Sequence, residues 1–266
     1  MSLTAYLCTT CGTQYAPATA APAHCMICED ERQYVNPKGQ GWATLPAVNR
    51  QYKNIFEKVT DNLFAIYTAP AFAINQRAHL LITPQGNVLW DCIANLDDST
   101  VELMERLGGI HSIAISHPHY YTTMAEWSVR FGDVPVYIHA GDRQWVARKD
   151  FNIVFWEGAE HSLLPGVKLV HTGGHFDGAA ILHYNAGNGL LLVGDAIQVC
   201  PDLQSVSFMY SYPNYIPLPE KAILKIKETL LPLNYDAMYG AFGHYLRENA
   251  AEHTLFSIER YLKIFR

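Results

Sequence analysis

The sequence has no long apolar run and no cluster of basic residues. Its 266 residues include 19 Lys and Arg against 25 Asp and Glu, for a formal net charge of −6. No window approaches the roughly 20 apolar residues that a membrane-spanning helix needs. A basic run that would bind a phosphate backbone or an anionic membrane is also missing. We therefore expect a small-molecule substrate, with no nucleic acid and no membrane as partner; the sequence identifies no protein partner.

The first residues lack the pattern of a secretory signal. In MSLTAYLCTTCG, no basic segment is followed by an apolar one,. This absence predicts a cytoplasmic protein. The sequence also has no internal repeat, and its 49% hydrophobic residues can build a sizeable core,. We expect one large domain with a small appendage.

Cysteine is scarce, yet four of the six cysteines fall in the first 28 residues. They form two C-x2-C pairs, Cys8 with Cys11 and Cys25 with Cys28, separated by thirteen residues. Two such turns supply the tetrahedral sulfur set that zinc prefers, or iron in a rubredoxin-like site. Two disulfides are the alternative, which a reducing compartment disfavours. We predict a four-cysteine zinc knuckle over residues 1–40, with His24 as a bystander, and a second domain over residues 41–266.

The main body alternates short β-rich runs with helical patterns. Strands in groups, with helices between and after them, predict two packed sheets with helices outside, a layered α/β or α+β body. Asp97 is a candidate N-cap for the first of these helices. The expected strands are 62–68, 78–83, 88–91, 112–116, 134–140, 152–156, 168–172, 179–184, 189–195 and 237–242, and the expected helices are 98–109, 124–132, 141–149, 219–230 and 251–265.

Candidate metal ligands lie at strand ends or in the loops that follow them. His117 and His119 follow the apolar run SIAI, and in an extended chain their side chains point to the same side,. His175 follows two glycines, Asp195 follows LLLVG, and His244 lies in YGAFGHY. Three imidazoles and one water make the open tetrahedral site of catalytic zinc, which yields hydroxide at neutral pH.

The segments SHPHYYTTMAEW, HTGGHFDGAAI, LLLVGDAIQ and YGAFGHY, in this order, resemble the metallo-β-lactamase superfamily. The resemblance implies an α+β fold, the αββα four-layer sandwich, with the metal at one edge between the sheets. It implies that Asp91 supports the site locally. It also implies that His117, His119 and His175 form the first metal site, that Asp195 is the bridging carboxylate, and that His244 is the last ligand of a second site.

The sequence departs from the family pattern H-x-H-x-D-H at two positions. Tyr121 and Thr122 stand where the family has Asp and His, so the second site loses two ligands. We therefore expect one metal, with Asp195 as a fourth ligand or as the group that orients the water. Tyr121 is a candidate donor to an oxyanion, with packing as the alternative, and Asp177 is a candidate ligand of a weak second site.

These observations predict a metal-dependent hydrolase that uses a metal-bound hydroxide on an ester, thioester or amide. The expected cofactors are two Zn²⁺ ions, one in the knuckle and one in the hydrolase site, with iron possible in either. The alternatives are a mononuclear iron oxidoreductase and a non-catalytic binding module with a degenerate site. The aromatic segment 201–219 is a candidate wall over the metal, through Tyr210, Tyr212 and Tyr215.

Overall fold

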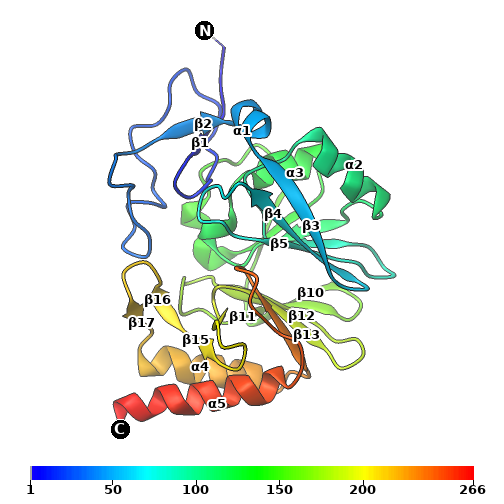
Figure 1. Ribbon diagram of the computed structural model, residues 1–266, viewed down its shortest axis with the longest axis vertical. Helices are drawn as coiled ribbons and strands as arrows, with labels where there is room; N and C mark the ends of the chain where they lie inside the picture. The colour runs from blue at the N-terminus through cyan, green and yellow to red at the C-terminus, as the bar shows by residue number, and fades with distance from the viewer. Residues whose placement is uncertain (1) are drawn as a thin grey trace.

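Two β-sheets face each other, and helices cover the outer face of each in a computed structural model that describes residues 2–266 (Figure 1). The first sheet has the strand order β3-β4-β5-β6-β7-β8-β9, and the second has the order β10-β11-β12-β13-β18-β19. This is the αββα sandwich that the resemblance implied. The strands of the first sheet are β3 (Lys53–Thr60), β4 (Leu63–Ala69), β5 (Ala78–Leu81), β6 (Val88–Trp90), β7 (Ser112–Ala114), β8 (Val136–His139) and β9 (Ile153–Trp156). Those of the second are β10 (Glu160–Leu164), β11 (Val167–His171), β12 (Ala180–Tyr184), β13 (Leu190–Gly194), β18 (Ala237–Gly240) and β19 (Tyr245–Leu246).

Buried apolar side chains form three layers that follow the sandwich. On β5, Leu80 packs in the cluster under the helices of the first half, whereas Leu81 packs in the cluster between the two sheets. Adjacent residues of a strand face opposite sides of a sheet, so alternation along β5 serves two cores at once. A third cluster joins the second sheet to its helices. The helices are α1 (Leu45–Gln51), α2 (Asp98–Arg106) and α3 (Met124–Arg130) in the first half, and α4 (Glu220–Leu230) and α5 (Ala250–Leu262) in the second.

The expected strands are present, and four of the five expected helices are α-helices. Asp97 caps α2 by accepting the backbone N–H of Thr100 at 2.9 Å. The segment expected as a helix over 141–149 is a 3₁₀ helix, Ala140–Trp145. The sequence patterns did not predict α1, β3 or β10. The segment 201–219, which showed no clear period, carries the short strands β15 (Val206–Ser207), β16 (Met209–Ser211) and β17 (Ile216–Pro217).

The N-terminal residues 2–44, here called the cysteine module, form a separate lobe against the sandwich. Its two strands, β1 (Tyr6–Cys8) and β2 (Trp42–Thr44), pair antiparallel. The pairing ties Cys8 to Trp42, a residue beyond the expected boundary at residue 40, and that boundary stays a prediction. In Figure 1 the blue chain of the module runs down one side of the sandwich towards β16 and β17.

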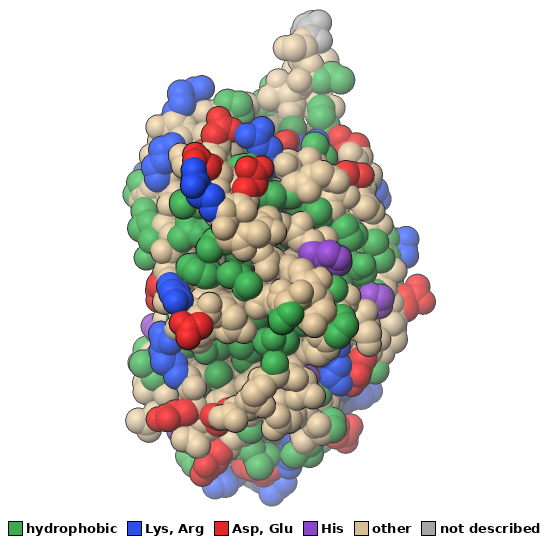
Figure 2. All heavy atoms as spheres, turned by 90° about the vertical axis from the view of Figure 1, so that its right-hand side faces the viewer, with side chains coloured by type: hydrophobic (Ala, Val, Ile, Leu, Met, Phe, Trp, Pro, Cys, Tyr) green, Lys and Arg blue, Asp and Glu red, His purple; other side chains and the backbone are tan. Residues whose placement is uncertain are grey.

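The expectations for membrane and nucleic-acid partners concern the helices and the surface charge of the described residues. Among residues 2–266, no helix is both long and apolar enough to cross a membrane. Figure 2 shows basic and acidic side chains interspersed on one face. The expectation that nucleic acids and membranes are not partners stays a prediction.

Candidate metal centres

Four side chains that the sequence placed at strand ends converge at one edge of the sandwich. Ligand atoms of His117, His119, His175 and Asp195 all lie within 4.8 Å of one another, and all four residues are buried. His117 follows β7 in extended conformation, and a 3₁₀ turn over Pro118–Tyr120 then brings His119 to the same point. His175 lies between β11 and β12, and Asp195 follows β13 directly. The turn, rather than the expected extended alternation, makes the two histidines converge.

The donor atoms of this histidine site fit a metal ion. Nε2 of His175 lies 3.4 Å from Nδ1 of His119, and Nε2 of His117 lies 3.0 Å from Oδ1 of Asp195. Nε2 of His117 is buried and has no hydrogen-bond partner among the described residues. An unpartnered buried nitrogen facing a carboxylate and two further imidazoles is satisfied by a cation at their centre.

Burial keeps the site in the protonation state that binds metals. It lowers the pKa of His119 well below its ordinary value, with a smaller effect from His117 and His175, and it lowers the pKa of His175 to about 4. Both rings are therefore neutral at pH 7. Burial alone would raise the pKa of Asp195, but the three histidines hold it well below its usual range. Neutral imidazoles and an ionised carboxylate are the forms that coordinate zinc.

Hydrogen bonds behind the ligands fix their orientation. Nδ1 of His175 lies 3.0 Å from the carbonyl oxygen of Met209, and Nδ1 of His117 lies 3.1 Å from the hydroxyl of Ser116. Such partners leave the opposite ring nitrogen free for a metal. The backbone N–H of Ser116 donates to Oδ1 of Asp91 at 2.7 Å. Asp91 is fully buried and contacts the residue that precedes His117, which agrees with the local support that the resemblance implied.

Of the two adjacent tyrosines, Tyr121 has the packing role that was the alternative, and Tyr120, for which no role was expected, contacts a candidate ligand. The hydroxyl of Tyr121, expected near an oxyanion, donates instead to the carbonyl oxygen of Asp142 at 3.2 Å. The hydroxyl of Tyr120 donates to Oδ1 of Asp195 at 3.1 Å. The correction follows from the 3₁₀ turn, which points Tyr120 towards the ligands and Tyr121 into the core under the helices. The sequence signal for Tyr120 was its place next to His119.

The residues considered for a second metal site do not come together: one is covered by the cysteine module, and two lie outside the converging group. Thr122 is buried beneath the cysteine module: its carbonyl oxygen accepts the N–H of Gln14 at 2.9 Å, and a Cβ at Gly12 would lie 3.3 Å from its Cγ2. Contrary to the expectation for a ligand, His244 is half-buried and outside the converging group. Asp177 is exposed and also outside it.

Phe176 packs against all three histidine ligands, a contact that the sequence did not predict. Its ring stacks on His117 with centroids 5.4 Å apart, and it meets His119 and His175 edge-on at 5.0 and 5.2 Å. Trp145 contacts Phe176 at 5.8 Å and also packs on the core of the cysteine module. The pair therefore links the module to the histidine site.

A cavity of about 320 Å³ opens at the histidine site. Of the three tyrosines of the aromatic segment, Tyr212 lines this cavity, Tyr210 bonds to Glu31, and Tyr215 is 85% exposed. His119, His175 and Asp195 form its floor. Its other lining residues are Gln33, Tyr34, Ala73, Ile74, Asn75, Pro213 and Phe242.

The four cysteines of the module form a second candidate centre. Their sulfur atoms lie within 4.8 Å of one another, and the pairs Cys8–Cys28 and Cys11–Cys25 are 3.6 Å apart. Tetrahedral zinc with bonds of about 2.3 Å separates its sulfur ligands by roughly 3.8 Å. None of the four is in a disulfide. Burial raises the pKa of the Cys11 thiol well above its ordinary value, so a set of thiolates here requires a cation,. His24 is exposed and pairs with Glu29 instead.

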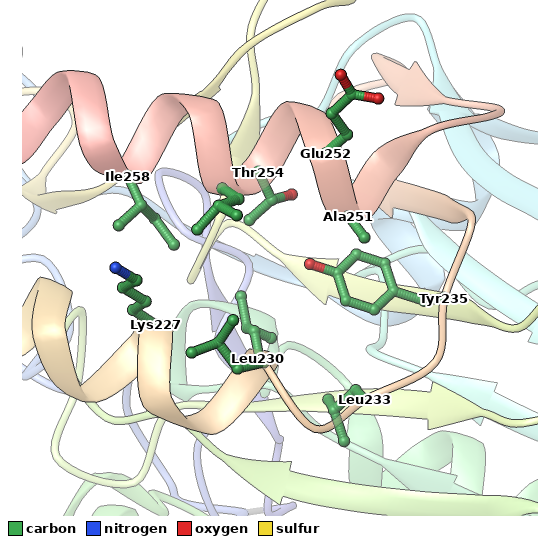
Figure 3. A pocket seen from close by; sticks show the side chains of 10 residues that line it. Lys227, Leu230, Leu233, Tyr235, Ala251, Glu252, Thr254 and Ile258 are labelled. Atoms are coloured by element: carbon green, nitrogen blue, oxygen red, sulfur yellow. The ribbon is translucent and has the colours of Figure 1, made fainter.

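Another hollow, of about 300 Å³, lies between α4 and α5 (Figure 3). Figure 3 shows Leu230, Tyr235 and Ile258 lining it, with Lys227 and Glu252 at its rim. It contains no histidine or cysteine. The histidine site, rather than this hollow, is therefore the candidate active site.

Comparisons with known proteins agree with the fold. No family model matches the chain. The chain is 46% identical over 263 residues to "Uncharacterized protein YmaE" of Bacillus subtilis (strain 168). The aligned residues make up 97% of this chain and 96% of that protein. Among solved structures, DIM-1 metallo-β-lactamase is similar with a TM-score of 0.60 and 14% identity, covering 79% of this chain and 98% of that one. VMB-1 is similar with the same TM-score and coverage and 11% identity. The chain therefore belongs to the same family as YmaE and has the metallo-β-lactamase fold.

Proposed function

We propose that the protein is a metal-dependent hydrolase that acts on a small ester, thioester or amide. The observation that carries this proposal is the convergence of three imidazoles and one carboxylate, all buried, at the floor of a cavity. A zinc ion held there supplies a Lewis acid that polarises a carbonyl group and acidifies water. Similarity in fold to metallo-β-lactamases supports hydrolysis as the reaction class,.

The residues around the site suit this chemistry. Asp195 is ionised and accepts the hydroxyl of Tyr120, so its carboxylate is held in one orientation towards the centre of the site. Burial raises the pKa of Tyr212 well above its ordinary value, so it remains a phenol, and its hydroxyl donates to the carbonyl oxygen of Ser207 at 3.3 Å. Phe176 and Trp145 exclude water behind the histidines.

We propose one metal ion in the histidine site, with zinc as the ion. The proposal is supported by the positions of Tyr121 and Thr122, which are turned into the core or covered by the module. It is also supported by the absence of His244 and Asp177 from the converging group of described residues.

The test combines metal analysis with a hydrolysis screen. Protein purified without a tag is loaded with zinc or, anaerobically, with Fe²⁺, and assayed on 4-nitrophenyl esters, thioesters and anilides. Hydrolysis that His117→Ala abolishes and His111→Ala retains supports the proposal, since His111 is exposed and outside both centres. Turnover that needs iron and oxygen contradicts it in favour of an oxidoreductase. A histidine site that binds no metal contradicts it in favour of a binding module.

A further inference from the structure

One wall of the catalytic cavity comes from the cysteine module rather than from the sandwich. Gln33 and Tyr34 line the cavity together with His119, His175 and Asp195. Gln33 is only 4% exposed, whereas Tyr34 is 45% exposed. The module thus does more than cover the sandwich: it places two side chains within the space where a substrate meets the metal ligands.

An arginine of the module anchors this wall on the histidine site. The Arg32 guanidinium donates to both carboxylate oxygens of Asp30, at 2.6 and 2.9 Å, and lies 4.0 Å from the centroid of Phe176. Its Nη1 also donates to the carbonyl oxygen of His175 at 3.4 Å. A cation over an aromatic face is attracted by the ring, and more strongly where water is partly excluded. Arg32 therefore fixes the segment that precedes Gln33.

The aromatic segment holds the same wall from the other side. The Asn214 amide donates to the carbonyl oxygens of Glu31 and Gln33, at 2.9 and 3.3 Å. The hydroxyl of Ser211 donates to the carbonyl oxygen of Arg32 at 3.3 Å. Because these bonds go to backbone atoms on three successive residues, they set the path of the chain into the cavity.

The wall has a defined chemistry. Apart from Asp195, the lining contains no carboxylate, and it contains no lysine or arginine. Oε1 of Gln33 accepts the backbone N–H of Tyr34 at 3.2 Å, which leaves its Nε2 as the donor of that side chain. Ile74, Pro213 and Phe242 add apolar surface. A donor amide and aromatic walls without lysine or arginine suit an uncharged group, and an anionic group has no ionic partner among these side chains,.

We propose that Gln33 and Tyr34 of the cysteine module are substrate-recognition residues, and that they select an uncharged acyl compound of small size. The proposal deepens the hydrolase proposal and rests on it for the reaction. Recognition itself is a property of the cavity and is measurable without turnover.

The test measures binding of benzohydroxamic acid to the zinc-loaded full chain by calorimetry, against the same compound carrying a para-carboxylate. We expect the wild type to bind the uncharged compound about tenfold more tightly than the carboxylate, and Tyr34→Ala and Gln33→Glu to weaken its binding about fivefold, with zinc content unchanged. Val35→Ala is the matched control, because Val35 is exposed next to Tyr34 and does not line the cavity. Tyr34 is exposed enough that its replacement leaves the fold intact.

Each outcome decides one proposal. Equal binding of the two compounds, unchanged binding in both variants, or no binding to the loaded wild type overturns the recognition proposal. Ester hydrolysis is measured on the same samples. Weakened binding in the variants without any hydrolysis by the wild type leaves recognition supported and contradicts the hydrolase. Hydrolysis by the wild type, with unaltered KM and unaltered probe binding in both variants, supports the hydrolase and overturns the recognition proposal.

Discussion

The hydroxyl of Tyr120 donates a hydrogen bond of 3.1 Å to Oδ1 of Asp195. The same oxygen lies 3.0 Å from Nε2 of His117, so the tyrosine holds the carboxylate on the side that faces the histidines. Tyr120 is fully buried, and burial raises the pKa of its hydroxyl well above the ordinary value. It is therefore a permanent donor near pH 7 and a positioning residue for the carboxylate.

Replacing Tyr120 by Phe removes this donor and keeps the ring. We expect metal affinity at the histidine site to fall about tenfold, because outer hydrogen bonds to ligands are typically worth about 10- to 100-fold in affinity or activity. Competition with a chelator of known zinc affinity measures the change. Tyr121→Phe is the matched control: it loses a hydrogen bond to a backbone carbonyl, which lowers the free energy of unfolding by about 1 kcal/mol and leaves zinc affinity unchanged,. Equal zinc affinities of the Tyr120→Phe and Tyr121→Phe variants would refute the role of Tyr120 as a positioning residue.

The two candidate centres are separable by elemental analysis. We expect two zinc ions per wild-type chain, one lost in Cys8→Ser/Cys11→Ser and the other in His117→Ala/His119→Ala. The cysteine variant should also become sensitive to proteolysis within residues 12–24, since a lobe this small depends on its metal for folding energy. Cys92→Ser, at a buried cysteine outside both centres, is the control. Loss of both ions in a single double variant would show that the centres are not independent.

Four of the five residues predicted as ligands of this site converge, whereas His244 does not. The four could be predicted because their signals are local and follow the order of the motifs that resemble the metallo-β-lactamase superfamily. Each follows a strand end, and His175 also follows Gly173 and Gly174, whose φ values of 62° and 87° are in the left-handed region. The alternation of strands and helices predicted two packed sheets with helices outside, and the resemblance to the metallo-β-lactamase superfamily implied the αββα arrangement. Such signals need only neighbouring residues.

Contacts between distant segments could not be predicted in the same way. Arg32 meets the backbone of His175 across 143 positions, and nothing in the local pattern around either residue encodes that contact. The distinction between Tyr120 and Tyr121 depended on a single 3₁₀ turn, where the strand period of two does not apply,. Packing against distant residues sets the side-chain direction in such a turn, and a local pattern of residue types does not specify that packing.

Gly194 provides a test of how tightly the site is packed. Its φ is 56°, and a Cβ there would lie 2.7 Å from the hydroxyl oxygen of Ser116, the partner of His117. We expect Gly194→Ala to lower the free energy of unfolding by about 2 to 4 kcal/mol, from backbone strain and this overlap together. It should also weaken zinc binding, because Ser116 must move.

Gly187→Ala separates the two effects in the same experiment. Gly187 has a φ of 59°, and a Cβ there would have no atom within 4 Å. An alanine at this position would therefore have backbone strain but no steric overlap. Chemical denaturation of both variants should show a loss of about 1 kcal/mol for Gly187→Ala, with zinc affinity unchanged. If Gly194→Ala is no less stable than this control, the close approach to Ser116 does not constrain the site.

Asp142 should make stability depend on pH in the acidic range. Burial raises its pKa to about 7, although its Oδ1 accepts the N–H of Gly178 at 2.8 Å. The unfolded chain releases this proton near pH 4, whereas the folded chain retains it up to about pH 7,. Between these values the folded state binds more protons, so the contribution of Asp142 to the free energy of unfolding falls as pH rises and is constant above pH 7. The full difference is on the order of 4 kcal/mol as an upper bound.

Asp142→Asn isolates this contribution, because the amide does not titrate while it keeps an oxygen for the Gly178 N–H. Urea denaturation of wild type and variant at pH 4.5, 5.5, 6.5 and 7.5 gives the difference in unfolding free energy at each pH. We expect the variant to gain stability relative to the wild type as pH rises, by about 1 kcal/mol per pH unit below pH 7. The slope rather than the absolute level is decisive, because an asparagine at this site adds an amide nitrogen beside Gly178 whose cost is the same at every pH. A pH-independent difference would mean that the pKa of Asp142 is not raised by folding, because its carboxyl would then be ionised in both states across this range.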